Sequence, residues 1–249
     1  MLHSFLLIGQ SNMAGRGFIA DAKALDNRGL YCMRNGRWQP LFRPVNPDRP
    51  FSGTNLAERF ARLYADEYQT EVGLIPCADG GTALKKWEKG TLLYENAVNH
   101  VRLAARTSVI AGILWHQGET DCYGDEKNFY RERLEKFFAD LRRDADLSGV
   151  PVVVGGLGDY LAEYADEEIR KNHPIITRIT REYAQSTPLT AFADGNGLPC
   201  NPDHLHFSAE GLERFGERYF AAYQSIAKNA RLAVPNELIR DTHTALEML

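Results

Sequence analysis

Four short polar clusters in this 249-residue chain contain the residue types that acyl-transfer chemistry needs. The first cluster, Gly-Gln-Ser-Asn, follows an apolar run directly, so Ser11 would lie at the end of a buried strand. A serine hydroxyl is a weak nucleophile until a base removes its proton, and an acid must orient that base. Ser11 is therefore a candidate nucleophile. The alternative is that Ser11 only caps the short helix predicted after it, and this stretch alone favours that alternative.

The last cluster, Asp-His-Leu-His, offers a base and the acid to orient it. Asp203 and His206 are three residues apart, so one turn of chain brings their side chains together. The carboxylate can then accept a hydrogen bond from one ring nitrogen and leave the other nitrogen as the base. His204 is expected to point elsewhere. Two alternatives stay open: surface histidines ahead of a helix capped by Ser208, and a metal site built from Asp203, His204 and His206.

The two middle clusters could supply hydrogen-bond donors to the oxyanion that forms when a carbonyl is attacked. Gly80 and Gly81 follow a second apolar run, and glycine lets the backbone approach a ligand and direct an N–H at it. Gln117 follows a third apolar run and carries an amide donor. The N–H of Ser11, at the start of a helix, would be a further donor. The alternatives are an ordinary Asp-Gly-Gly turn and a Gln117 amide that pairs with loop backbone.

Side chains close to these clusters are candidates for supporting roles or for substrate contact. They are Gln10, Asn12, Arg16, Trp87 and Glu119. Arg16 and Trp87 are the candidates for substrate contact, because an indole can lie against a sugar ring. The alternatives are a surface salt bridge for Arg16 and core packing for Trp87. Glu119 is expected to brace the active-site loops or to act as a second acid near the candidate base.

Two common nucleotide and hydrolase motifs are absent from the first cluster. Its sequence does not match a phosphate-binding loop, and no Gly-x-Gly-x-x-Gly pattern follows the first strand. Gly9 precedes Ser11 by two positions, but Met13 stands where the elbow of an α/β-hydrolase needs glycine. The chain is therefore not an ordinary α/β-hydrolase.

The overall composition is typical of a globular protein, with 44% hydrophobic and 25% charged residues. The net charge of −4 argues against nucleic acid as the main partner. No apolar run approaches the ~20 residues that a membrane span needs. The N-terminus lacks a positive leader and a cleavage site, so the expected location is the cytoplasm. The four cysteines are widely spaced, as expected for reduced and mostly buried thiols.

The elements that would position these clusters alternate along the chain. Apolar runs predict five buried parallel strands, at residues 4–9, 72–78, 109–117, 150–157 and 188–194. Helical spacing of apolar residues predicts helices at 55–68, 129–144, 175–185 and 208–227. This alternation predicts one α/β domain over 1–249, an open sheet with helices on both faces, and a site at the carboxyl ends of its strands.

Two segments have no strong pattern. Residues 16–54 have weak periodicity, and we interpret them as a long excursion over the same end of the sheet, either a lid or a substrate wall. Residues 228–249 form a C-terminal extension in which a short helix is expected.

Taken together and in order, the stretches "GQSNMAGRG", "CADGGTALKKW", "LWHQGETD" and "DHLHFSAEG" resemble the SGNH-hydrolase superfamily. They are more similar to its branch of carbohydrate and sialate O-acetylesterases, which includes the acetylxylan esterases of carbohydrate esterase family 6. The resemblance extends from residue 5 to about residue 220. It implies a flavodoxin-like three-layer α/β/α fold and a metal-free serine esterase that needs no cofactor. Thr120, where serine is expected, and Asp79, where a small or apolar residue is common, depart from the pattern.

The resemblance assigns the triad and the oxyanion hole to residues already singled out by their chemistry. They are Ser11, Asp203 and His206 for the triad, and Ser11, Gly80, Gly81 and Gln117 for the oxyanion hole. Gly81 fits the glycine of the second motif better than Gly80 does. Gln117 stands where the superfamily usually has asparagine.

The implied activity is removal of O-acetyl groups from carbohydrates through an acetyl-enzyme, with acetylated xylo-oligosaccharides, sialic acid or related sugars as substrates. The expected partner is thus a small acetylated sugar or oligosaccharide, with neither nucleic acid nor a membrane involved. The alternatives are a non-catalytic carbohydrate-binding protein, a thioesterase or lipid esterase, and a metal-dependent deacetylase built on His116, Glu119, Asp203 and His206. The sequence makes no prediction of the oligomeric state.

Overall fold

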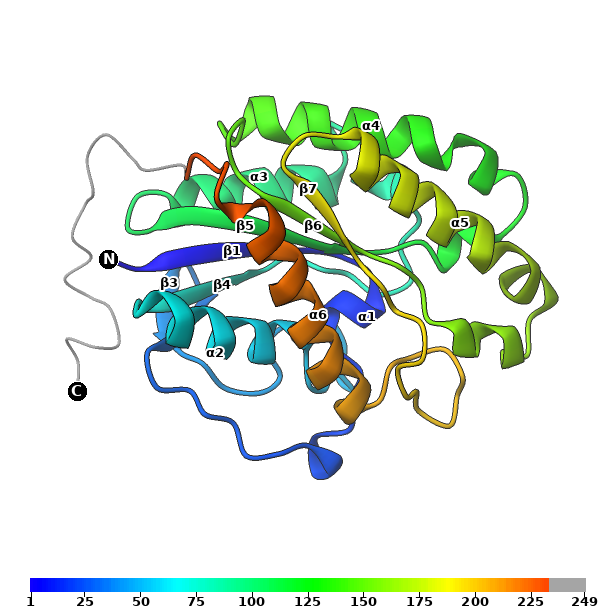
Figure 1. Cartoon of the computed structure of the whole chain (residues 1–249), viewed down its shortest axis with the longest axis horizontal. Coiled ribbons are helices and arrows are strands. Elements are labelled where there is room, and N and C mark those ends of the chain that lie inside the picture. Colours follow the sequence, from blue (N-terminus) through cyan, green and yellow to red (C-terminus); the bar gives the residue numbers. More distant parts are fainter. Residues whose placement is uncertain (233–249) are drawn as a thin grey trace.

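One sheet of seven strands organises residues 1–232, which are the residues that this computed structural model describes (Figure 1). The strand order is β3–β2–β4–β1–β5–β6–β7. All neighbouring strands are parallel except β2 and β3, which pair antiparallel at one edge. The strands are β1 (His3–Gly9), β2 (Leu30–Arg34), β3 (Arg37–Pro40), β4 (Val72–Pro76), β5 (Val109–His116), β6 (Val152–Gly155) and β7 (Thr190–Ala193).

The sheet has two more strands than the five that the sequence predicts. The five predicted runs form β1, β4, β5, β6 and β7, whereas β2 and β3 lie within the segment 16–54 and extend the sheet at one edge. Asn35 and Gly36 connect the two added strands, with φ angles of 50° and 75°. Positive φ at both positions is what a two-residue hairpin turn requires, and Asn-Gly is its usual sequence signal.

Six α-helices and four short 3₁₀ helices connect the strands of the described chain. The helices are α1 (Ser11–Ala14), α2 (Leu56–Tyr68), α3 (Leu92–Ala104), α4 (Glu126–Asp144), α5 (Glu167–Ser186) and α6 (Ala209–Ala227). The 3₁₀ helices are η1 (Ile19–Asp21), η2 (Leu84–Trp87), η3 (Thr120–Cys122) and η4 (Asp159–Glu163). The prediction omitted α3, and it started α5 eight residues late because Pro174 lies inside that helix.

The helices cover the two faces of the sheet as separate layers (Figure 1). Side chains of α3, α4 and α5 pack with Leu6 and Ile8 of β1 on one face. Side chains of α2 and α6 pack with Phe5 and Leu7 of the same strand on the other face. Successive residues of a strand point to opposite faces, so the central strand contributes to both cores. The expected three-layer α/β/α architecture is confirmed.

The ends of β1 and β5 meet at one edge of the sheet and direct the chain into the candidate site. The N–H of Gln10 donates to the carbonyl of His116 at 2.9 Å. Gly9 has a φ of 131°, and a Cβ at this position would lie 2.0 Å from the His116 oxygen. Only glycine permits this close approach. The chain then turns sharply into α1, which begins at Ser11.

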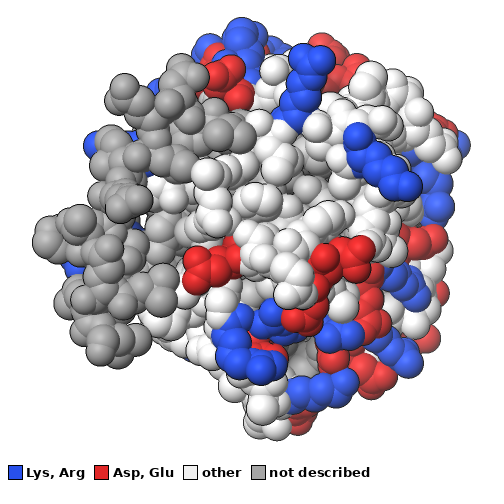
Figure 2. Space-filling model, turned by 60° about the vertical axis from the view of Figure 1, so that its left-hand side comes forward, with Lys and Arg blue, Asp and Glu red and all other residues white. Residues whose placement is uncertain are grey.

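Charge on the face shown in Figure 2 is mixed, with basic and acidic side chains interspersed around a broad uncharged area. Among residues 1–232, no helix is both long enough and apolar enough to cross a lipid bilayer. The helix expected in the tail 228–249 falls mainly on residues 233–249, which lie outside the described residues.

Candidate active site

The structure brings together the serine, histidine and aspartate that were predicted from three distant motifs. Ser11 Oγ lies 3.0 Å from His206 Nε2, and His206 Nδ1 lies 2.6 Å from Asp203 Oδ2. Because an ionised carboxylate can only accept hydrogen bonds, Nδ1 carries the ring proton and Nε2 is left to accept the serine hydroxyl. The three groups therefore form a continuous hydrogen-bonded chain with the polarity that nucleophile activation needs.

A tight turn before α6 presents the imidazole. Asp203 Oδ1 accepts from the backbone N–H groups of Leu205 and His206, at 2.9 and 3.0 Å. Burial raises the pKa of the Asp203 carboxyl, but the hydrogen bonds from the His206 ring and from these two N–H groups outweigh burial and hold the pKa below its usual value. Ser208 caps α6 as predicted, accepting from the N–H of Gly211 at 3.1 Å. The acid is thus fixed in its ionised form beside the ring.

Ser11 does not cap the helix that follows it. The N-cap of α1 is Gln10, which makes no side-chain cap hydrogen bond, and the hydroxyl of Ser11 is directed at His206 instead. Within the described chain, no acceptor is hydrogen-bonded to the backbone N–H of Ser11. An unpaired N–H at the first residue of a helix is available to a ligand oxygen.

Asn12 links the nucleophile turn to the loop that carries the imidazole. Its Nδ2 donates to Glu119 Oε1 at 2.6 Å and to the carbonyl of Leu205 at 3.2 Å. Its Oδ1 accepts from the N–H of Phe207 at 3.0 Å. These bonds span His206 on both sides along the chain, so Asn12 fixes where the ring lies relative to Ser11.

Glu119 is buried beneath the site and braces it. Besides Asn12, its neighbour is His116, whose Nε2 lies 3.5 Å from Glu119 Oε1. Burial raises the pKa of the Glu119 carboxyl, but the neighbouring His116 ring and the hydrogen bond from Asn12 bring the net value below its usual one. In the described structure none of its hydrogen bonds reaches His206, so of the two predicted roles the geometry favours bracing.

Gln117 is fully buried, and its amide is already engaged by the protein. Its Nε2 donates to the carbonyl of Thr82 at 3.0 Å and to Asp121 Oδ2, and it lies 3.3 Å from Gln10 Oε1. An amide nitrogen has only two hydrogens, so none is left for an oxyanion. The expectation of a direct donor therefore needs correction: in this geometry Gln117 holds the Thr82 end of the glycine loop.

Asp121 is a buried acid that sequence reasoning did not single out. It accepts from Gln117 and from the backbone N–H of Leu84 at 2.9 Å. Burial raises the pKa of its carboxyl to about 6, although both donors act in the opposite direction. The acid and Gln117 together fix the start of η2 behind the glycine loop.

The two glycines of the second motif present their N–H groups differently. The N–H of Gly80 donates to Asp48 Oδ2 at 2.9 Å and is therefore occupied. No acceptor among residues 1–232 is hydrogen-bonded to the N–H of Gly81. Gly81 has a φ of 75°, and a Cβ there would meet no atom within 4 Å, so backbone conformation rather than space favours glycine.

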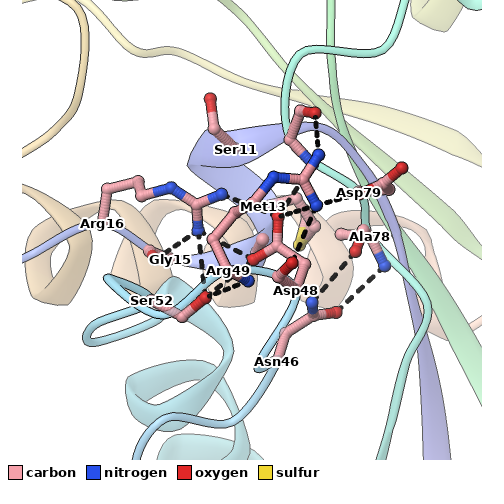
Figure 3. Close-up of polar contacts among 12 residues, drawn as sticks. Ser11, Met13, Gly15, Arg16, Asn46, Asp48, Arg49, Ser52, Ala78 and Asp79 are labelled. Carbon is pink, nitrogen blue, oxygen red and sulfur yellow. Dashed lines mark hydrogen bonds and ion pairs between the residues drawn. The ribbon is translucent and has the colours of Figure 1, made fainter.

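A short piece of the 16–54 segment holds this glycine loop from below, and we call residues 46–52 the brace loop (Figure 3). The side chain of Asn46 exchanges two hydrogen bonds with the backbone of Ala78, at 2.9 and 3.0 Å. Arg49 donates to Asp79 Oδ1 at 2.8 Å and to the carbonyl of Gly80 at 2.9 Å. The predicted lid or wall is thus also the support of the candidate oxyanion loop.

Arg16 belongs to the same network as a buried ion pair. Its two terminal nitrogens bind the two carboxylate oxygens of Asp48, at 2.9 and 2.7 Å. The side chains are only 4% and 5% exposed, so the pair is buried rather than the surface salt bridge considered as its alternative. Ser52 Oγ adds a third donor to the carboxylate at 2.8 Å. Burial raises the pKa of Asp48, and these donors together lower it below its usual value.

Trp87 is not a substrate contact in this structure, which corrects the prediction. Its side chain is fully buried in the core, edge-on to Trp115 and Phe137. The indole N–H donates to Thr82 Oγ1 at 3.1 Å. The physical reason is that η2 turns the side chain inward, behind the glycine loop rather than over it.

A cavity of about 330 Å³ opens above the hydroxyl of Ser11. Its floor consists of polar groups of the predicted motifs, namely Gln10, Ser11, Gly80, Gly81, Glu119 and His206. The other lining residues come from Arg16, the brace loop, the segments around η3, η4 and α5, and the turn before α6. The wall residues are Arg16, Arg49, Phe51, Thr120, Tyr123, Tyr164, Ile169 and Leu205. Except for Arg16, sequence reasoning named none of these as site residues.

Metal-ligating residues are not grouped in the described part of the chain. Over residues 1–232, no three His, Cys, Asp or Glu side chains lie together in a way that could hold a metal ion. His204 has a φ of 51° and its Nδ1 lies 3.3 Å from Glu163 and 3.9 Å from Cys200 Sγ, away from the Asp203–His206 pair.

Comparison with solved structures identifies the class of fold. The chain is similar to a protein from Arabidopsis thaliana, with a TM-score of 0.79, 26% identity, and coverage of 90% of this chain and 98% of that one. A carbohydrate acetylesterase from Xanthomonas citri gives a TM-score of 0.67 at 16% identity, over 90% of this chain and 56% of that one. A carbohydrate acetylesterase family member from Sinorhizobium meliloti gives 0.58 at 12% identity, over 92% and 100%. The fold is that of the SGNH hydrolases.

The family follows from the sequence itself. A sequence model of the family described as SASA, carbohydrate esterase, sialic acid-specific acetylesterase, matches residues 1–225. Because the match covers most of the chain, this protein belongs to that family of carbohydrate esterases. The chain is also 27% identical, over 89% of its length and 90% of the relative's, to a protein named "probable carbohydrate esterase" in Arabidopsis thaliana.

Proposed function

We propose that this protein hydrolyses O-acetyl esters of carbohydrates, with Ser11 as the nucleophile, His206 as the base and Asp203 as the acid that orients it. The observation that carries the proposal is the 3.0 Å separation between Ser11 Oγ and His206 Nε2, at the floor of a cavity. The membership of a carbohydrate esterase family supports the substrate class.

In the first step, His206 Nε2 takes the hydroxyl proton as Ser11 Oγ forms a bond to the acetyl carbonyl carbon. The carbonyl becomes a tetrahedral oxyanion. When this intermediate collapses, the bond from the carbonyl carbon to the sugar oxygen breaks, and His206 gives its proton to the departing sugar hydroxyl. Asp203 stays ionised throughout and stabilises the imidazolium by the 2.6 Å hydrogen bond to Nδ1.

In the second step, His206 removes a proton from water while the water oxygen attacks the acetyl-enzyme. The bond between the acetyl carbon and Ser11 Oγ then breaks, and the serine oxygen recovers the proton from His206. Acetate leaves, and the resting state is restored. Microscopic reversibility gives the same imidazole nitrogen both proton transfers.

The oxyanion donors that the geometry supports are the backbone N–H groups of Ser11 and Gly81, because both lack an acceptor in the described structure and both residues line the cavity. Gln117 and the N–H of Gly80 do not donate to the oxyanion themselves, since each already donates to the protein, and they support the oxyanion hole by holding its loop. Loss of one properly placed donor typically costs about 10²–10³-fold in turnover.

The test is acetate release from a panel of acetylated sugars by the wild-type chain, by Ser11→Ala and by Ser225→Ala, a control serine on α6. We expect Ser11→Ala to stay folded and to lose about 10³-fold or more of kcat, as removal of a nucleophile does. Ser225→Ala should match the wild type. A serine-directed phosphonate should add one mass equivalent to the wild type and none to Ser11→Ala. Wild-type activity in Ser11→Ala would refute the assignment.

The three predicted alternatives have distinct outcomes, the third of them in an added chelation experiment. A carbohydrate-binding protein without turnover would release no acetate and would not react with the phosphonate. A thioesterase or lipid esterase would react with the phosphonate but prefer long-chain thioesters or esters over acetylated sugars. Activity that persists after exhaustive chelation would argue against a metal-dependent deacetylase.

A further inference from the structure

We propose that the cavity takes a neutral O-acetylated sugar and discriminates against sugars that carry a carboxylate, such as sialic acid. This inference rests on the proposed function and specifies its substrate class. It departs from the sialic acid specificity in the family's description, and it follows from how the charged side chains around the cavity are paired.

Arg16 is a cation at the cavity wall, but its charge is already neutralised. Both terminal nitrogens bind Asp48, whose side chain is buried with it. One of these nitrogens also donates to the carbonyl of Gly15 at 2.9 Å. A bidentate pair of this kind occupies the edge of the guanidinium that would otherwise grip a substrate carboxylate.

Arg49 is the second cation of the wall, and it is also paired. It donates to the Asp79 carboxylate at 2.8 Å and to the carbonyl oxygens of Asp48 and Gly80 at 2.7 and 2.9 Å. Among the cavity-lining residues that the structure describes, Arg16 and Arg49 are the only lysine or arginine side chains. Neither therefore offers an unpaired positive charge to an anionic sugar.

Acidic groups outnumber these two cations around the cavity. Glu119 lines the floor with its Oε2 buried and unpartnered, and Asp203 lies directly behind the imidazole. Asp48 and Asp79 neutralise the two arginines, so with His116 and His206 neutral, Glu119 and Asp203 leave the immediate surroundings with a net negative charge. A substrate carboxylate would lose its water in this field and gain no compensating partner.

The opposite walls of the cavity suit an uncharged ring. Phe51, on the brace loop, is 69% exposed, and the guanidinium carbon of Arg16 lies 5.3 Å from the centre of its ring. Tyr123 and Tyr164 also line the cavity. Aromatic faces can pack against the apolar C–H face of a sugar. The volume of about 330 Å³ is at the small end of ligand pockets, which suits a single sugar unit.

The test compares kcat/KM for acetate release within two matched pairs, with acetylated methyl xyloside as the neutral reference. One pair is O-acetyl-N-acetylneuraminic acid and its 1-carboxamide, and the other is an O-acetylated methyl glucuronoside and its uronamide. The amides keep size and hydrogen bonding while removing the charge. We expect kcat/KM for the xyloside and for each amide to be about tenfold or more above kcat/KM for the carboxylates. This is the factor expected from one unscreened like-charge contact.

The Asp79→Asn variant tests the cause, because it frees the charge of Arg49 without changing the size of the side chain. We expect this variant to reduce the amide-to-carboxylate ratio of kcat/KM by about threefold or more, whatever its effect on overall turnover. Asp66→Asn, which makes the same charge change on the exposed surface of α2, should leave this ratio unchanged.

Three results would contradict this inference, and each contradicts a different part of it. A carboxylate substrate cleaved as fast as its amide or as the xyloside refutes charge discrimination while leaving the esterase function intact. Failure of every acetylated sugar, together with no phosphonate labelling, refutes the proposed function and this inference with it. An amide-to-carboxylate ratio of kcat/KM that is unchanged in Asp79→Asn refutes the proposal that pairing of Arg49 with Asp79 causes the discrimination.

Discussion

Asp48 provides the sharpest test of how the candidate site is supported. Its buried carboxylate holds Arg16 through two hydrogen bonds and also holds the N–H of Gly80. Asp48→Asn keeps the shape of the side chain but leaves the guanidinium buried without a counter-charge. Breaking a buried ion pair from one side costs about 3–5 kcal/mol. At about 2–4 °C per kcal/mol for a chain of this size, the melting temperature should fall by roughly 6–20 °C.

The assay is thermal unfolding, monitored by far-ultraviolet circular dichroism. The kcat of each variant is measured well below the melting temperatures. Glu58→Gln is the matched control, because Glu58 forms a comparably buried pair with Arg43 at 2.8 Å, away from the cavity. Glutamine can retain the capping bond that Glu58 makes at the start of α2. Asp48→Asn should lose more stability than Glu58→Gln, because burial outweighs pairing and raises the pKa of Glu58 while that of Asp48 is lowered. Only Asp48→Asn should lose kcat, by about tenfold or more, because Asp48 holds the glycine loop and Glu58 does not.

The pH dependence should differ as well. The pKa of Asp48 is depressed in the folded state, so its contribution to stability is present above the ordinary value of 3.8 and is lost as pH falls through the folded value. Asp48→Asn should remove this acid-labile contribution. A melting temperature within 2 °C of the wild type, or an equal loss of kcat in Glu58→Gln, would refute the reasoning.

Two further predictions concern other carboxylates of the site, the exposed Asp203 and the buried Asp121. Asp203→Asn should reduce kcat about 10³–10⁴-fold with the fold intact, since asparagine can stabilise the wrong tautomer of His206, and a loss below tenfold in acetate release would contradict this. In the folded state the pKa of Asp121 is raised to about 6 from 3.8. The free energy of unfolding is therefore highest at low pH, where Asp121 is protonated, and falls by about 3 kcal/mol as pH rises from about 4 to above 6. Asp121→Asn should therefore show a flatter plot of unfolding free energy against pH, and parallel plots would disprove the assignment.

The sequence was sufficient to predict five strands of the sheet, including β7 at one edge, but not β2 and β3 at the other edge. Central parallel strands are buried on both faces, so they appear as continuous apolar runs such as residues 4–9 and 150–157. β3 is the edge strand, and exposed residues such as Arg37 break its apolar pattern. β2 lies next to it and is buried, but it has only five residues and ends in Arg34. Their signal was the turn at Asn35 and Gly36, which was not used.

The candidate site was predictable where local spacing decides geometry. Asp203 and His206 are close in the chain, and the turn between them fixes their contact whatever the rest of the fold does. The partners of Arg16 were not predictable in this way, because Asp48 lies 32 residues away and its position depends on how the segment 16–54 folds back. The burial of Trp87 likewise depends on the packing of η2 against β5 and α4, which no local pattern states.

The brace loop holds the glycine loop mainly through main-chain atoms, and this allows some side chains of the site to vary. Asn46 and Asp48 recognise Ala78 and Gly80 only through main-chain atoms, so the side chains at those positions contribute nothing to the grip. Position 79 is the exception, because Arg49 reaches its carboxylate. Phe51 belongs to the same loop but makes none of these hydrogen bonds, so position 51 can vary, and with it the sugar preference, while the reactive groups stay in place. Related proteins with the same nucleophile can thus differ in substrate preference through a few side chains at the edge of the cavity.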